Sequence, residues 1–224
     1  MTRAFTEQIG PLIAEHLPEF EFQRRCHRLY RGTETGWQAI ALEVLPSATP
    51  GMGKIAAYAQ VRHDVLEALY TPHHPYLKPK ESKAHPTLTI NCDALVKREE
   101  LVHAFKLDSA IVKDLSDAYA KSIKVDVIPW LERFSNEQAL FEGLAGSDPK
   151  TWATSDRLTR FPVLMAILAK RGDTVGFDRV GSEFQEWCKN KHALVYASLA
   201  TAMLKMRPSE RLGGEGAMGS DLSI

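Results

Sequence analysis

The sequence predicts an α+β fold: a small antiparallel sheet of about four strands packed with helices, followed by an all-helical C-terminal segment. Two observations predict this fold. Before about residue 92, apolar side chains recur at every second residue in several short segments, as in half-buried strands. After residue 108 they recur every three to four residues, as in amphipathic helices.

Length and composition set the expected domain organisation. The chain has 224 residues, of which 44% are hydrophobic and 25% are charged, an ordinary composition for a packed globular protein. We expect an α+β domain over residues 1–145 and a helical segment over 155–207 that packs on it. Glycine and proline mark 146–154 as the boundary. The composition then turns to Gly and Ser, which predicts a disordered tail over 208–224.

The first half of the chain holds the expected strands. A helix over 5–17 stops before Pro18, and the alternation over 20–31 predicts a strand. The turn signal at 32–36 joins it to a returning strand, which makes a hairpin. The further elements are the returning strand at 37–45, a loop at 46–53, a strand at 54–62, a short helix at 64–69, a proline-rich irregular segment at 71–86 and a strand at 87–92.

Helical periodicity runs through the second half. Asp108 is suited to cap a long helix, which Pro129 ends or kinks. The residues Ser135-Asn136-Glu137-Gln138 match a capping box that opens the next helix, through Leu144. Three more helices are expected, at 161–170 with Thr159 as the cap, at 177–189 and at 192–206.

Bulk properties narrow the classes of function. Lys+Arg and Asp+Glu both number 28, so no net charge draws the whole molecule to nucleic acid or to an anionic membrane. The cysteines Cys26, Cys92 and Cys188 are far apart, unlike those of a disulfide scaffold or a zinc knot. The N-terminal residues lack a secretory signal, and the apolar stretch 193–206 is too short to span a bilayer. We therefore expect a cytoplasmic protein without membrane association.

Two strings resemble nucleotide-binding motifs but lack the context that gives these motifs their chemistry. The glycines of 214–219 match G-x-G-x-x-G, yet only five residues follow in which a phosphate-binding helix would form. The segment 50–54 resembles the end of a P-loop, but Ile55 replaces the magnesium-binding Ser or Thr. We expect no cofactor.

The expected hairpin carries the candidate binding residues Arg24, Arg28, Tyr30, Arg31 and Trp37. Arginine forks and stacking aromatic rings bind phosphates, RNA or an acidic protein surface. The alternative is a solvated strand edge, where charge prevents edge-to-edge aggregation. Because the arginines alternate between the two faces, at most half of them can serve one ligand. We expect another protein as the partner, with nucleic acid as the alternative.

The segment 63–92 is rich in histidine, and with nearby carboxylates such side chains bind metals. No pair of its histidines has the spacing of metal ligands on a helix. Surface histidines in a proline-rich loop are the other interpretation. We expect no metal, and keep His63, His74 and His85 as the alternative set of ligands.

The order of features resembles a family of uncharacterised bacterial proteins, known only as a domain of unknown function. The resemblance covers roughly residues 5–145. It implies a fold but no activity, because that family offers no catalytic residues to carry over. The residues that carry it are Phe20-Glu21-Phe22-Gln23-Arg24, Tyr30-Arg31, Gly36-Trp37-Gln38 and Ile128-Pro129-Trp130-Leu131-Glu132.

The leading hypothesis is a non-catalytic intracellular binding or accessory protein, such as an immunity-like or regulatory partner of another bacterial protein. It rests on balanced charge and on the lack of a cofactor loop, spaced metal ligands or an activated nucleophile. The alternative is a metal-dependent or nucleic-acid-processing enzyme that uses the His-rich loop 63–92 and the arginine hairpin 24–37. Both hypotheses stay open at this point.

Overall fold

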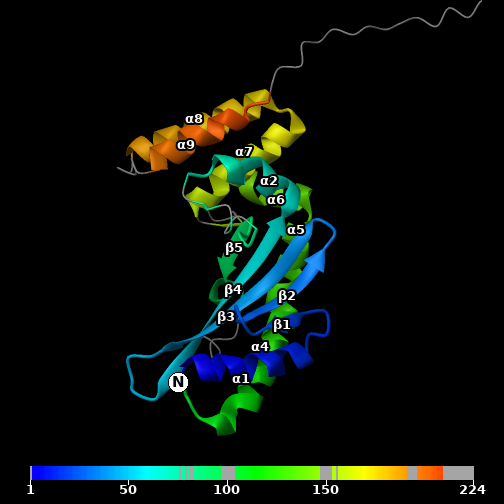
Figure 1. Ribbon diagram of the computed structural model, residues 1–224, viewed down its shortest axis with the longest axis vertical. Helices are drawn as coiled ribbons and strands as arrows, with labels where there is room; N and C mark the ends of the chain where they lie inside the picture. The colour runs from blue at the N-terminus through cyan, green and yellow to red at the C-terminus, as the bar shows by residue number, and fades with distance from the viewer. Residues whose placement is uncertain are drawn as a thin grey trace, which may run out of the picture.

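The computed structural model describes an α+β fold, as the sequence predicts, with an antiparallel sheet and a helical C-terminal part (Figure 1). Helices α8 and α9 lie at one end of the molecule and α1 lies at the other, with the sheet between them. The residues described are 2–75, 77–78, 80, 83–96, 104–146, 153–154, 156–190 and 196–208.

The sheet has six strands in the described residues, and each pairs antiparallel with its neighbours. The order is β1-β2-β3-β4-β5, and the short β6 also pairs with β4. The strands are β1 Glu21–Gln23, β2 Arg28–Thr33, β3 Gly36–Pro46, β4 Met52–His63, β5 Leu88–Asn91 and β6 Phe105–Lys106.

Helices precede, interrupt and follow the strands. The helix α2 begins directly where β4 ends, and α7 packs on α2 and α8. The helices are α1 Thr2–Glu15, α2 Asp64–Tyr70, α4 Val112–Ser122, α5 Ile128–Ser135, α6 Glu137–Ala145, α7 Arg157–Arg171, α8 Thr174–Asn190 and α9 Ala197–Met203.

One face of the sheet is buried under helices. The helix α1 packs against β3, where the hydroxyl of Thr6 accepts a hydrogen bond from the backbone N–H of Val44 at 3.1 Å. The helix α5 packs against β4, and Gln38 of β3 donates to the Leu131 carbonyl at 3.0 Å. Burial of each Val, Leu or Ile side chain there contributes about 1.5–3 kcal/mol, and burial of an Ala side chain contributes less. These side chains are at most 2% exposed and are Leu29, Ile40, Leu42, Val44, Ile55, Ala57, Ala59, Val61 and Leu88.

The opposite face, which we call the open face, is partly exposed in the described residues. Tyr58 and Leu45 lie on it with 38% and 39% of their surface exposed, whereas Trp37 is buried among its neighbours. Antiparallel sheets commonly leave one face to solvent. The open face consists of Glu21, Gln23, Arg28, Tyr30, Trp37, Ala39, Ala41, Glu43, Leu45, Lys54, Ala56, Tyr58, Gln60, Arg62, Thr89 and Asn91.

The expected single strand over 20–31 is wrong. Residues 24–27 form a turn, so the segment folds back as two short strands, β1 and β2, with Phe22 opposite Leu29. His27 takes a positive φ of 49°, a conformation that histidine adopts more readily than most residues. The turn contains neither glycine nor proline, so no residue that typically marks a turn indicated it. The sheet accordingly has more strands than the four expected, and β1 and β6 are too short to show alternation.

Two helix boundaries also differ from expectation. Pro129 does not end its helix, because a π-helical turn, Ile123–Val127, carries the chain from α4 into α5 with the proline in the first turn of α5. The cap of α7 is Asp156, whose carboxylate accepts from the N–H of Leu158, so Pro162 lies inside the helix rather than in its first turn. Asn136, the second residue of the expected capping box, caps α6.

The buried residues form one continuous core that extends from Phe5 in α1 to Met203 in α9. The expected domain boundary at 146–154 and the expected tail at 208–224 lie largely outside the described residues, as does the start of the helix expected at 192–206. In the described part of the chain, every helix falls short of the length or the apolar character needed to cross a membrane.

Candidate functional site

The open face brings three of the candidate binding residues together. Arg28, Tyr30 and Trp37 share it because Tyr30 lies opposite Ala39 and Arg28 opposite Ala41, both on the same side of β3 as Trp37. The guanidinium carbon of Arg28 is 5.5 Å from the centre of the Trp37 ring. The rings of Tyr30 and Trp37 have their centres 6.0 Å apart. The hairpin therefore presents one guanidinium and two rings as a cluster.

The other two candidates are placed elsewhere. Arg31 points to the buried face, where its Nε donates to Gln38 at 2.6 Å and its Nη2 lies 3.4 Å from Glu132 of α5. Its guanidinium also stacks over the ring of Phe20 at 4.7 Å. These contacts make Arg31 a link between the sheet and its helices. Arg24 is exposed in the turn between β1 and β2.

Sequence reasoning missed the half of this surface that β4 contributes. Tyr58 lies opposite Ala41, across from Arg28, and Gln60 lies opposite Ala39, across from Tyr30. Neighbouring strands are about 4.8 Å apart, so the two residues of each pair, one on β2 and one on β4, lie about 10 Å apart with an alanine of β3 between them. The signal was present in the sequence, because apolar residues at every second position from Ile55 to Val61 imply that Tyr58 and Gln60 between them face the other way. We call Arg28, Tyr30, Trp37, Tyr58 and Gln60 the aromatic patch.

The aromatic patch contains two polar atoms whose bonding is incomplete. The Nε of Arg28 and the Oε1 of Gln60 are buried and have no hydrogen-bond partner among the described residues. A buried polar group without a partner costs about 1–3 kcal/mol. Most buried polar groups in proteins have a hydrogen-bond partner.

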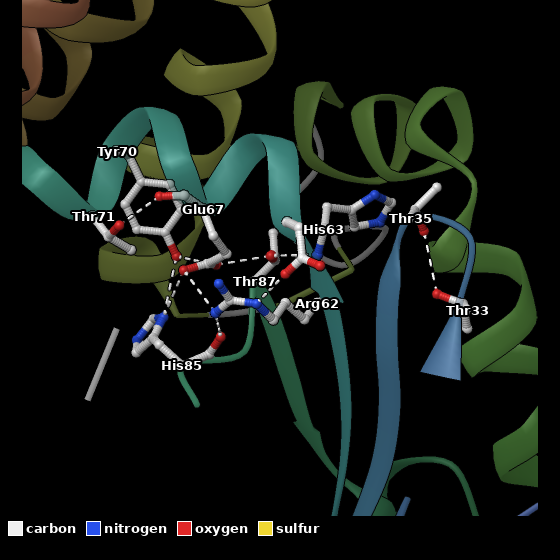
Figure 2. A network of polar contacts seen from close by, with 10 residues as sticks. Thr33, Thr35, Arg62, His63, Glu67, Tyr70, Thr71, His85 and Thr87 are labelled. Carbon is white, nitrogen blue, oxygen red and sulfur yellow. Dashed lines mark hydrogen bonds and ion pairs between the residues drawn. The ribbon is translucent and has the colours of Figure 1, made fainter. Parts of the chain in front are cut away.

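A second polar cluster lies at the end of β4, and we call it the Glu67 network (Figure 2). Glu67, one turn into α2, has no exposed surface. Its Oε1 accepts hydrogen bonds from the hydroxyl of Tyr70 at 2.6 Å and from that of Thr87 at 2.8 Å. In the part of the chain that the structure describes, its Oε2 accepts no hydrogen bond, and it lies 3.4 Å from Nδ1 of His85 and 3.7 Å from Nη1 of Arg62.

Arg62 compensates the buried charge and connects three segments. Its Nη1 donates to the backbone carbonyl of His85 at 2.7 Å, and its Nε donates to Asp64 at 2.6 Å. The hydroxyl of Thr87 also accepts from the backbone N–H of His63 at 2.9 Å. The Glu67 network thus joins the end of β4, the helix α2 and the segment before β5 (Figure 2). Burial first, and then the charge of Glu67, hold the pKa of Tyr70 well above its usual value, so Tyr70 remains a donor.

The structure brings His74 and His85 together but places His63 elsewhere. The ring centres of His74 and His85 are 6.3 Å apart. His63 points toward α5, and its Nε2 donates to the Phe134 carbonyl at 2.8 Å. In the described part of the chain, no three His, Cys, Asp or Glu side chains gather as a metal site would require. The alternative ligand set therefore has no common centre in these residues.

His63 predicts a pH dependence of stability. Burial is the main cause that lowers its pKa below the ordinary value of 6.5, so the folded state takes up this proton less readily than the unfolded state. The contribution of neutral His63 to the free energy of unfolding is therefore fully present above about pH 6.5. It is lost as the pH drops through that value, by at most about 1.4 kcal/mol per pH unit for one proton. Urea unfolding at about pH 7.5 and 5.5 measures the loss.

His63→Gln is the matched variant, because glutamine keeps an N–H donor for the Phe134 carbonyl but does not titrate. The variant should lose less stability on acidification than the wild type. Burial also lowers the pKa of His74, so part of the loss remains in the variant. An identical loss in both proteins would show that His63 does not carry this effect.

A cavity of about 150 Å³ adjoins the Glu67 network, where α2 packs on α7. It contains polar and apolar groups from both helices and from the segments that flank α2 and β5. Its lining residues are Tyr70, His74, His85, Asp156, Leu158, Thr159 and Pro162. Sequence reasoning singled out the two histidines of this cavity. It identified neither the lining residues that α7 contributes nor Glu67 of the adjoining network.

Comparison of the chain with protein-family models, with curated proteins and with solved structures gave no match. The resemblance of residues 5–145 to a family of uncharacterised bacterial proteins stays a prediction. Function is therefore inferred from the aromatic patch and the Glu67 network themselves.

Proposed function

We propose that this protein is a non-catalytic binding or accessory protein that docks another protein on the open face of its sheet. The observation that carries the proposal is the aromatic patch, in which Arg28 and Tyr30 lie against the buried Trp37 and Tyr58 flanks Ala41 opposite Arg28, on a face that other strands and helices leave partly exposed. Trp, Tyr and Arg are the residues most enriched among those that dominate the energy of protein–protein interfaces.

The charges of the open face favour a protein over a nucleic acid. Binding to a phosphate backbone relies on several cationic side chains that are free to neutralise phosphates. Here Lys54 pairs with Asp93 at 2.8 Å and Arg62 pairs with Asp64 at 2.6 Å. Glu21 and Glu43 add negative charge to the same face. The mixed charge suits a protein surface with both acidic and basic groups.

The chemistry of the open face favours binding over catalysis. Its described side chains are rings, amides, carboxylates, small apolar groups and cations, and include no histidine or cysteine. The imidazoles that an enzyme of the alternative kind would use lie elsewhere, since His63 points to α5 and His85 lines the cavity beside α7. An immunity-like or regulatory partner of a bacterial protein remains our proposal for the finer role.

Photo-crosslinking from the open face tests this proposal. We expect a benzophenone amino acid in place of Tyr58 to give a discrete adduct with one protein when cells are irradiated. The matched control is the same amino acid in place of Val175 of α8, which is 80% exposed and lies away from the sheet. Adducts with nucleic acid, or the same products from both positions, would contradict the proposal.

A further inference from the structure

We propose that the cavity between α2 and α7 is a binding site for a small primary ammonium compound, which donates hydrogen bonds to Asp156 and to the Nε2 of His85. The site is separate from the open face, and its ligand is of a different class. A cavity of about 150 Å³ accepts a compound of about six heavy atoms, as an engineered protein cavity of that volume accepts benzene.

His85 is held so that it offers an acceptor to the cavity. Its Nδ1 lies 3.4 Å from the buried carboxylate of Glu67 and 3.2 Å from the hydroxyl of Tyr70. That hydroxyl already donates to Glu67, so it can only accept from His85, and this hydrogen bond places the ring proton on Nδ1. The other ring nitrogen points away from the network (Figure 2) and keeps its lone pair. His85 lines the cavity, so this lone pair is available to a ligand there.

Asp156, which is exposed at the start of α7, supplies a negative charge to the lining. Its Oδ1 accepts from the backbone N–H of Leu158 at 3.0 Å, and its Oδ2 accepts from the hydroxyl of Thr159 at 2.7 Å. A carboxylate has about four lone-pair sites, so these two bonds leave room for a further donor. The capping bonds also fix the direction of the carboxylate.

The charged group and the acceptor of the lining favour a cation over an anion. Asp156 brings a negative charge and His85 an acceptor to the lining, whereas the opposite charges of Glu67 and Arg62 face each other outside the lining and offset each other. Burial first, and then the nearby His85, lower the pKa of His74, which favours its neutral form. A carboxylate or phosphate ligand would meet a negative charge and hydrogen-bond acceptors, whereas an ammonium group would be attracted by this charge and would donate to these acceptors.

The test is a titration of the full chain with ethylammonium chloride at about pH 8, where imidazole is neutral. The NMR signals of the histidine Cε1–H groups report binding. We expect saturable shifts of the His85 and His74 signals, with a dissociation constant on the order of 10 mM. The signal of His16, which pairs with Asp117 and is absent from the cavity lining, should not move. Sodium acetate at the same ionic strength should leave all three signals in place.

Asp156→Asn is the decisive variant, because asparagine is an equally good helix cap and differs from aspartate by the charge. It should fold like the wild type and bind ethylammonium about tenfold more weakly. Unchanged affinity in this variant would overturn the proposal. So would shifts of His85 and His74 with acetate that equal those with ethylammonium, or no shift with either compound. Changes at Arg28 or Tyr58 should not affect this titration, so the result is independent of the docking surface.

Discussion

Replacing Glu67 by alanine is expected to destabilise the protein by about 3–5 kcal/mol, which is the usual effect of removing one partner from a buried charged network. The substitution leaves the hydroxyls of Tyr70 and Thr87 without their acceptor, and removes the buried one of the two carboxylates beside Arg62, whose side chain is 11% exposed. Urea unfolding of the two proteins measures the difference in the free energy of unfolding.

Glu67→Gln is the matched variant for this effect. A glutamine carbonyl can still accept from Tyr70 and Thr87, but it carries no charge to compensate Arg62. We expect an intermediate loss of about 1–3 kcal/mol. Glu132, whose side chain is 61% exposed beside Arg31, is the surface control, and its change to alanine should cost no more than about 1 kcal/mol. If Glu67→Ala behaves like the surface control, the network does not stabilise the fold.

The long strands and the main helices could be predicted because the periodicity of their apolar residues extends over enough positions to be recognised. The alternation from Ile55 to Val61 and the helical repeat from Phe177 to Cys188 each match elements in the structure. The turn at 24–27 could not be predicted, because polar residues continue the alternation through it without glycine or proline. Short elements of two or three residues carry no period at all.

Only the residues of the candidate site that are close together in the chain could be predicted from the sequence. Arg28, Tyr30 and Trp37 are close in the chain, and alternation in β2 separates them from Arg31. Tyr58 belongs to a distant segment, and only the pairing of β3 with β4 brings it to the patch. Glu67 resembles an ordinary polar residue of a surface helix, and its burial depends on partners from β4 and from the segment before β5.

On the open face, alanine in place of Tyr58 or Arg28 is expected to weaken binding of the cross-linked partner protein about 30-fold each, as loss of a dominant interface residue does. Tyr58 is the most exposed ring of the aromatic patch, and Arg28 is held against Trp37 with its Nε unsatisfied. Arg28→Lys keeps the charge but loses the planar fork, and should recover only part of the affinity.

The affinity of the purified partner for Tyr58→Ala, compared with its affinity for Val175→Ala, tests the docking surface most directly. Both positions are exposed, and both changes remove apolar surface outside the core, so thermal unfolding should confirm that each variant stays folded. We expect the change at Tyr58 to weaken binding about 30-fold and the change at Val175 to leave it unchanged. Equal affinity of the two variants would contradict the assignment of the open face as the site where a protein binds.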